Sequence, residues 1–106
     1  MSKAKNKRTH LPRSSDYTKQ FLKDWQRLAR SGQFDLKKLK KVMIRLIENE
    51  EPLGPEWKEH ELIGNWQGFR ECRVGGDFLL IYKLHKTAKI ETIVFIRAGT
   101  HSELFR

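Results

Sequence analysis

The spacing of the apolar residues changes near the middle of this chain, and the change predicts two helices followed by a sheet. From residue 17 to residue 47 the apolar side chains recur every three or four positions: Tyr17, Phe21, Trp25 and Leu28, then Leu36, Leu39, Val42, Met43, Leu46 and Ile47. Each run is typical of one face of a helix. Residues 14–16 (Ser-Ser-Asp) supply a capping hydroxyl and an acid, so we expect the first helix to begin there and to end at Gly32. Asp35 is the expected cap of the second helix.

Later apolar runs are short, rich in β-branched residues and separated by turn residues. They predict strands over residues 69–74, 78–84 and 90–98, with Gly75 and Gly76 forming a tight hairpin turn. A last helical turn is expected over residues 102–105. Residues 9–13 are the candidate fourth strand, at an edge because Pro12 cannot donate a ladder hydrogen bond. The expected fold class is α+β, an N-terminal helical hairpin packed on an antiparallel sheet of three to four strands.

The length of 106 residues predicts a single domain over residues 9–106, preceded by a basic flexible tail over residues 1–8. The single Cys72 excludes an internal disulfide and lacks the companions of a zinc site, and in mid-strand we expect it to be buried and inert. No apolar run approaches the roughly 18 residues of a membrane span, and the Lys-rich start has no apolar segment of a secretory signal. These features favour a cytoplasmic protein.

The net charge of +9 is concentrated in the first half of the chain. Residues 1–45 contain 14 Lys/Arg and 3 Asp/Glu, a net charge of +11, whereas residues 46–106 contain 8 Lys/Arg and 10 Asp/Glu, a net charge of −2. A basic half indicates a polyanionic partner, which is nucleic acid, an acidic protein or a membrane surface. A solvated helix face is the alternative, although +11 exceeds what solubility requires. The predicted basic patch consists of Lys37, Lys38, Lys40 and Lys41.

The sheet half lacks several familiar catalytic motifs. It contains no GxxxxGK[ST] or GxGxxG phosphate loop, no HExxH and no close pair of cysteines. His60, Asp77 and His101 remain, an acid–base set with arginines nearby and no metal site. RNA cleavage needs such a set, because a base must take the 2′-hydroxyl proton, an acid must protonate the leaving 5′-oxygen and cations must stabilise the phosphorane.

Each candidate also has a plainer interpretation. His60, Asp77 and His101 could be ordinary turn and cap residues. Arg73 and Arg97 alternate with apolar neighbours, so they are either phosphate ligands or solvated strand charges. Phe105 is either a core residue or a platform for stacking on a base. The combination of these residues, rather than any one of them, indicates an RNase site.

Two stretches of the chain resemble the YafQ-like branch of the RelE superfamily of bacterial toxins. They are KEHELIGNWQGFRECRVGGDFLLIYKL (residues 58–84) and IRAGTHSELF (residues 96–105), within a similarity that covers residues 52–105. The ending is similar to the family's R-T-G-T-H-x-x-L-F. The resemblance implies a RelE-like microbial RNase fold and a ribosome-dependent endoribonuclease, or mRNA interferase, that cuts mRNA in the A site without a cofactor.

The same resemblance implies partners. These are a cognate antitoxin that neutralises the toxin, the 70S ribosome with its mRNA, and operator DNA, which only the toxin–antitoxin complex binds when it represses its own operon. No membrane partner is implied. The basic patch would then face ribosomal RNA phosphates.

Four positions match the family motifs: His60, Asp77, His101 and Phe105. Our hypothesis for these positions is that His101 is the general acid, either His60 or Asp77 is the general base, and Phe105 stacks on a base. The chain departs from the family at Arg73, where a histidine is usual. Arg73 cannot be a base because a guanidinium stays protonated, so we expect it to bind the scissile phosphate together with Arg97.

Two other classes of function remain open at this stage. One is a non-nucleolytic ParE-like toxin of the same superfamily, which acts on DNA gyrase. The other is an RNA- or DNA-binding module without chemistry. ParE-like toxins lack the acid–base set, and this chain retains most of it.

Overall fold

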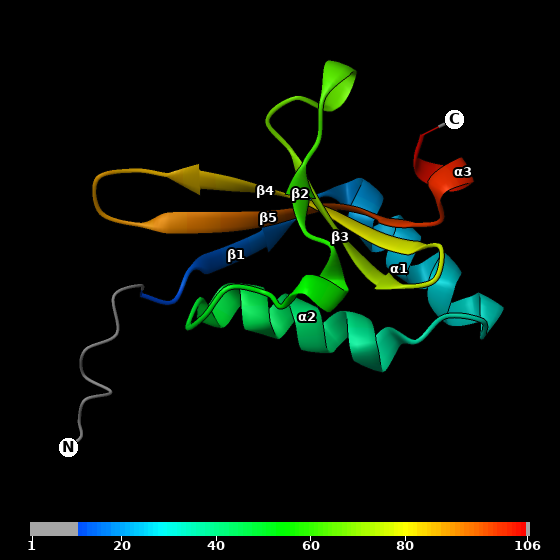
Figure 1. The fold of residues 1–106 in the computed structure, drawn as a ribbon. Coiled ribbons are helices and arrows are strands. Elements are labelled where there is room, and N and C mark those ends of the chain that lie inside the picture. Colours follow the sequence, from blue (N-terminus) through cyan, green and yellow to red (C-terminus); the bar gives the residue numbers. More distant parts are fainter. Residues whose placement is uncertain (1–10, 106) are drawn as a thin grey trace.

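The computed structural model describes residues 11–105, in which two helices cover one face of a five-stranded sheet (Figure 1). The order along the chain is β1 (Ser14–Tyr17), α1 (Lys19–Ser31), α2 (Leu36–Glu48), η2 (Pro55–Trp57), β2 (His60–Glu61), η3 (Gly64–Trp66), β3 (Arg70–Gly75), β4 (Phe78–Lys86), β5 (Glu91–Gly99) and α3 (His101–Leu104). The expected α+β fold class is confirmed. The expected tail over residues 1–8 lies outside the described residues.

The sheet has the strand order β1-β5-β4-β3-β2. The predicted meander of β3, β4 and β5 is confirmed, and its strands pair antiparallel. β2 adds two residues antiparallel to β3, while β1 pairs parallel with β5. The sheet therefore has five strands rather than the expected three or four. The sequence did not predict the two added strands because both are too short to show a repeating pattern of apolar residues.

The predicted start of the first helix was wrong. Residues 14–17 form β1, whose backbone pairs with β5 and whose Ser14 Oγ lies 2.6 Å from Thr92 Oγ1. The helix begins after Thr18, whose hydroxyl oxygen accepts a hydrogen bond from the Phe21 N–H at 2.9 Å. The candidate edge strand was also misplaced: residues 11–13 are not a strand, and residues 9 and 10 lie outside the described residues.

The end of α1 and the start of α2 lie where the sequence predicts them. Gly32 ends α1 in a left-handed conformation (φ 67°), which costs glycine little. Asp35 caps α2 by accepting a hydrogen bond from the Lys38 N–H at 2.9 Å. No helix in the described part of the chain is long and apolar enough to cross a membrane.

The two faces of the sheet bury different clusters. The main core lies between the helices and the sheet and includes Phe21, Leu28, Leu39, Val42, Leu46, Val74, Leu80, Tyr82, Ile93 and Phe95. The opposite face buries Leu79, Ile81 and Leu104, with Leu62, Trp66, Phe69, Ile96 and Phe105 packed against them. We call this second face the open face, because α1 and α2 do not cover it (Figure 1).

Cys72 lies in the main core with no exposed surface, which confirms that this thiol is buried. Burial, followed by the nearby carboxylates Glu59 and Glu71, raises the pKa of the thiol to about 12. Because the thiolate is the reactive form, the folded protein should resist alkylation by iodoacetamide at pH 8, while the denatured protein reacts fully. Mass spectrometry of the two samples measures this. Rapid modification of the folded protein would contradict the buried position of Cys72.

Candidate active site

Asp77 and His101 meet where the β3–β4 hairpin approaches the end of β5. The hairpin turns through Gly76, whose φ of 52° favours glycine, and Asp77 follows it. Asp77 Oδ1 accepts a hydrogen bond from the His101 backbone N–H at 3.0 Å and lies 3.4 Å from the ring atom Nδ1. Both side chains remain more than half exposed, so the pair can meet a ligand.

His101 begins α3, a single turn fixed by a capping box. The Thr100 hydroxyl oxygen accepts from the Glu103 N–H at 3.3 Å, and Glu103 Oε1 accepts from the Thr100 N–H at 2.8 Å. The His101 ring centroid lies 5.3 Å from that of Phe105, which in turn lies 5.6 Å from that of Trp66 at 73°. Aromatic rings therefore line the open face beside His101.

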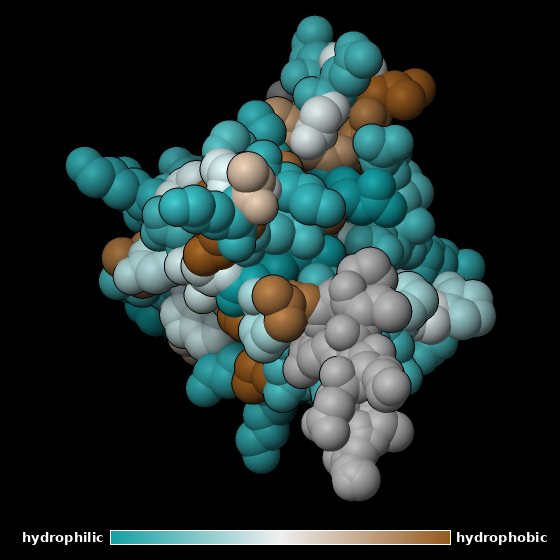
Figure 2. Space-filling view, turned by 90° about the vertical axis from the view of Figure 1, so that its left-hand side faces the viewer, coloured by the Kyte–Doolittle hydropathy of each residue, from teal (hydrophilic) through white to brown (hydrophobic). Residues whose placement is uncertain are grey.

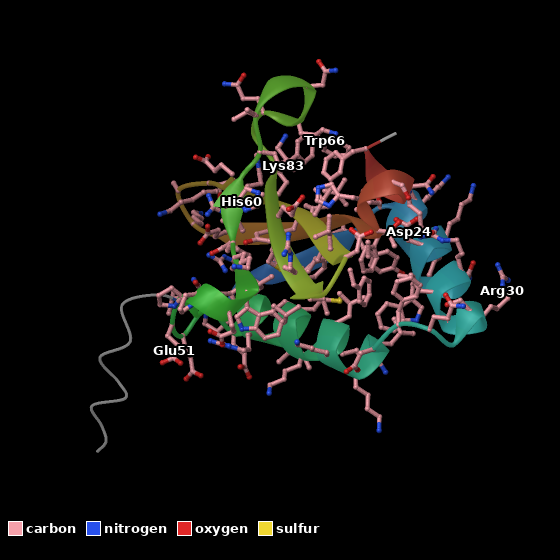
Figure 3. The ribbon with its side chains drawn as sticks, turned by 45° about the vertical axis from the view of Figure 1, so that its right-hand side comes forward. Asp24, Arg30, Glu51, His60, Trp66 and Lys83 are labelled. Carbon is pink, nitrogen blue, oxygen red and sulfur yellow. The ribbon has the colours of Figure 1, made fainter. Side chains whose placement is uncertain are left out.

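His60 lies on β2, away from this pair, and has its own carboxylate partner (Figure 3). Its Nδ1 is 2.8 Å from the Lys58 carbonyl oxygen, which can only accept, so Nδ1 carries the hydrogen in this bond. Its Nε2 is 3.5 Å from Glu71 Oε2, and Glu71 is 5% exposed. The ring is thus held with Nε2 directed at a buried carboxylate.

Arg73 lies between the two histidines on the open face. His60 pairs with Glu71, and Arg73 is two residues farther along β3, so the three side chains share one face. Arg73 also begins a row across the sheet that passes through Leu79 to Gly99, two residues before His101. Its Nε is buried and has no hydrogen-bond partner among the described residues. The Nε of Arg73 is therefore not engaged by a carboxylate, unlike the Nε of Arg97.

Arg97 does not join these residues. Its Nε and Nη2 donate to the two carboxylate oxygens of Asp24 in α1, at 2.8 and 3.1 Å. Asp24 has no exposed surface, and it also accepts from Arg27 Nη1 at 2.8 Å and from the Ala98 N–H at 3.0 Å. Because a carboxylate already neutralises Arg97, the structure does not support the expected phosphate-binding role for it.

The Asp24 carboxylate is strongly stabilised in its charged form. Burial alone would raise the pKa of Asp24, but the hydrogen bonds from Arg97 and Arg27, together with that from the Ala98 N–H, outweigh burial and lower it below its usual value. Asp24 therefore stays ionised and acts as an anchor between α1 and β5. Figure 3 shows it where α1 passes α3.

The basic patch on α2 reaches toward the Asp77 hairpin. All four lysines are exposed. Lys38 Nζ lies 5.4 Å from the centroid of the Trp57 ring, and Lys40 Nζ lies 5.7 Å from that of Trp25. A cleft of about 400 Å³ is lined by Gln33, Phe34, Asp35, Lys38, Val74, Gly75, Asp77, Phe78 and Thr100. This cleft connects the patch to the Asp77–His101 pair.

A comparison with known proteins assigns the family. Residues 13–106 match the family described as the bacterial toxin of type II toxin–antitoxin systems, YafQ. The chain belongs to the YafQ family. The mRNA interferase toxin YafQ of Escherichia coli K12 is 42% identical over 95 residues, which are 90% of this chain and 98% of that protein. By this homology the expected class of enzyme, an mRNA interferase, is confirmed.

Solved YafQ structures agree with the fold. The crystal structure of YafQ from E. coli BL21(DE3) is 39% identical, covers 89% of this chain and 99% of that chain, and superposes with a TM-score of 0.78. The E. coli DinJ–YafQ toxin–antitoxin complex contains a chain that is 41% identical, with coverage of 91% and 100% and a TM-score of 0.75. The family resemblance inferred from the sequence is therefore confirmed.

In this YafQ-family chain, sequence reasoning missed three residues of the candidate site and its support. Asp24 falls on the same helical stripe as Phe21 and Leu28, and an acid on an apolar stripe signals a buried partner. Glu71 precedes Arg73 by two positions, which places both on one strand face. Trp66 gave no distinctive signal, because its contact with Phe105 joins segments far apart in sequence. In the described part of the chain, no three His, Cys, Asp or Glu residues gather as a metal site.

Proposed function

We propose that this YafQ-family chain cleaves mRNA in the ribosomal A site by acid–base catalysis without a metal ion. The observation that carries the proposal is the order of His60, Arg73 and His101 on the open face, with a cation between two titratable rings. Cleavage through the 2′-hydroxyl needs groups in this order, because proton removal and proton donation occur on opposite sides of the scissile phosphate.

His60 serves as the base in this proposal. Its Nδ1–H is donated to the Lys58 carbonyl, so Nε2 carries the remaining lone pair of the ring and is the atom that takes the 2′-hydroxyl proton. The 2′-oxygen then attacks phosphorus. Glu71, 3.5 Å from Nε2, stabilises the imidazolium that forms. Asp77 was the other candidate base, but its contacts with His101 favour a role in orienting that ring.

His101 serves as the acid. The bond from phosphorus to the 5′-oxygen breaks as His101 donates a proton to that oxygen, which yields a 2′,3′-cyclic phosphate and a 5′-hydroxyl. Arg73 binds the phosphate and stabilises the charge that develops on its oxygens. Phe105, half-buried beside His101 and Trp66, offers an aromatic surface on which a neighbouring base stacks.

A cognate antitoxin is the second part of the proposal. The E. coli relative has been solved as a complex of YafQ with the antitoxin DinJ. We propose that this chain is likewise neutralised by an antitoxin of its own, and that the pair binds operator DNA and represses its operon. Retardation of an operator fragment by the pair, and not by the toxin alone, supports this. Equal retardation by the free toxin contradicts it.

A translation-coupled cleavage assay tests the proposed function. The toxin is freed from its antitoxin and added to programmed 70S ribosomes, and the new 5′ ends of the mRNA are mapped and their chemistry determined. We expect cuts within the A-site codon with 5′-hydroxyl ends, and none on the same mRNA without ribosomes. Equal cleavage of free mRNA would exclude ribosome dependence, and 5′-phosphate ends would exclude attack by the 2′-hydroxyl.

Charge reversal in the basic patch should weaken ribosome binding. Lys37→Glu and Lys41→Glu remove exposed charges that would face ribosomal RNA, and affinity for RNA falls by about 0.7–0.9 log units per log unit of salt for each phosphate contacted. The double variant should therefore bind ribosomes at least about tenfold more weakly at moderate salt, with a shallower salt dependence. Co-sedimentation at several salt concentrations measures both.

A matched control is Lys89→Glu, which reverses an exposed charge in the β4–β5 hairpin. The side of the molecule that carries this hairpin is hydrophilic, with scattered apolar side chains (Figure 2). Circular dichroism should show that all variants stay folded. Ribosome affinity that is unchanged in the α2 variants, or equally reduced by Lys89→Glu, would remove the proposed role of the patch.

A further inference from the structure

The outer edge of β5 is completed by the side chain of Thr18, which caps α1, and by side chains of α1 itself. β1 pairs with β5 only as far as Phe95. Beyond that residue the Thr18 hydroxyl donates to the Ile96 carbonyl oxygen at 2.8 Å, the Asp24 carboxylate accepts from the Ala98 N–H, and Arg27 Nη2 lies 3.3 Å from the Ala98 carbonyl oxygen. α1 is thereby fixed against the segment that leads into the active site.

Arg27 extends this connection to the helix that carries His101. Its Nη2 lies 3.2 Å from Glu103 Oε1, the same oxygen that accepts from the Thr100 N–H. Both side chains cross directly over Gly99, where an added Cβ would lie 2.5 Å from Glu103 Oε1 and 3.0 Å from Arg27 Nη2. Asp24 raises the pKa of Arg27, so the guanidinium stays charged between the two carboxylates.

α3 cannot fix its own orientation, because a helix of four residues is not stable alone. Its position depends on contacts at three points. Asp77 binds the His101 N–H, Leu104 is buried in the open-face cluster, and Glu103 is tied to Arg27. The third contact is the one that links α3 to a long, well-packed helix.

We propose that Asp24, Arg27 and Glu103 form a brace that positions His101 for proton transfer. This inference rests on the proposed function, in which His101 is the acid. The three residues do not touch substrate, so they are positioning residues. A catalytic group displaced by about 1 Å can lose on the order of a hundredfold in rate, so loosening α3 should lower kcat. The Arg27–Glu103 pair is about one-third exposed, so breaking it should leave the fold largely intact.

Two substitutions test the brace by different routes. Arg27→Met removes the cation and nearly preserves the length of the side chain. Glu103→Lys repels Arg27. We expect each to lower kcat on ribosomes about tenfold to a hundredfold, with KM nearly unchanged. The melting temperature should stay near the wild-type value in Glu103→Lys and fall in Arg27→Met, which also removes one partner of the buried Asp24. Glu103→Gln keeps an acceptor for the Thr100 N–H and should lose only a few-fold. Arg27→Lys should retain more activity than Arg27→Met.

The matched control is Arg30→Met, in the same helix, where the exposed side chain points away from the sheet (Figure 3). Arg30→Met should cleave mRNA on ribosomes with the kcat of the wild type. A second measurement does not depend on activity: proton NMR contacts between the His101 and Phe105 rings, whose centroids are 5.3 Å apart, should weaken in Glu103→Lys and persist in Arg30→Met.

The outcomes separate the brace from the proposed function. If the wild type cleaves mRNA while Arg27→Met and Glu103→Lys cleave at the wild-type rate, the brace is wrong and the proposed function stands. If the wild type does not cleave, the proposed function fails, and unchanged ring contacts in Glu103→Lys would also exclude the brace. If Arg27→Met does not fold, the cleavage rates of the two Glu103 variants test the brace instead. Glu103 is partly exposed, so its substitution should not unfold the chain.

Discussion

His101→Ala is expected to abolish growth arrest and to lower the rate of ribosome-dependent mRNA cleavage by about 10²- to 10⁴-fold, the usual contribution of a general acid. The reason is the position of the ring. Asp77 contacts Nδ1, so Nε2 is left to protonate the 5′-oxygen, and no other histidine adjoins the Asp77 hairpin in the described part of the chain. Single-turnover cleavage on programmed ribosomes measures the loss.

The control for this substitution is His85→Ala, because His85 is exposed near the far end of β4. It should leave cleavage unchanged. Ribosome binding by His101→Ala should equal that of the wild type, since the lost step is chemical. Cleavage at the wild-type rate by His101→Ala would show that another group is the acid. Loss of ribosome binding together with cleavage would instead indicate that His101 is a binding residue.

Asp24→Ala is expected to destabilise the fold more than any other single substitution considered for this chain. It leaves Arg97 without its carboxylate partner, removes one partner of Arg27 and leaves the buried Ala98 N–H without an acceptor. Breaking a buried ion pair by removing one partner costs about 3–5 kcal/mol. A domain of this size has a total stability of about 5–15 kcal/mol, so the melting temperature should fall by roughly 15–30 °C.

Denaturant and thermal unfolding measure this change, and Asp16→Ala provides the control. Asp16 is exposed on β1, so its removal should alter stability by no more than about 0.5 kcal/mol. Asp24→Asn, which keeps the shape but not the charge, should fall between the two. A loss below about 1 kcal/mol for Asp24→Ala would mean that Asp24 is not a net anchor.

The same carboxylate predicts the direction of the pH dependence. The pKa of Asp24 is lower in the folded chain than its usual value of 3.8. A lowered folded-state pKa contributes stability that is present above the unfolded pKa and is lost as the pH falls through the folded pKa. The contribution is therefore complete well above the unfolded value of 3.8 and is lost progressively as the pH falls below that value and through the lower folded-state pKa, and Asp24→Ala should lack this part of the acid sensitivity.

The sequence predicted the elements whose evidence is local. α2 combines a clear apolar stripe with Asp35 as its cap, and the β3–β4 hairpin is marked by Gly75 and Gly76. Both were located from the sequence, and β4 extends two residues beyond its predicted end at residue 84. β1 was read as a helix start because Ser and Asp favour both caps and turns. Its pairing with β5 is a contact across the length of the chain, which no local pattern reveals.

In the candidate site, too, residues marked by local motifs were predicted and residues that depend on long-range contacts were not. Asp77 and His101 were both singled out from motifs, and the structure brings them together. The expected phosphate-binding role of Arg97 did not take account of the buried Asp24, which pairs with it and lies 73 residues earlier in the chain. Glu71 beside His60 was missed for a similar reason: β2 has only two residues, too few to show which strand it would join.

The parallel pairing of β1 with β5 affects when a newly synthesised toxin becomes active. Ser14 lies against Thr92, 78 residues later, so the sheet cannot close until nearly all of it has been synthesised. Pairings of such long range are slow to form. His101 follows β5 and begins α3, whose position depends on contacts with Asp77 and with Arg27 of α1. The ribosome that makes this chain has therefore synthesised nearly the whole sheet before the site forms.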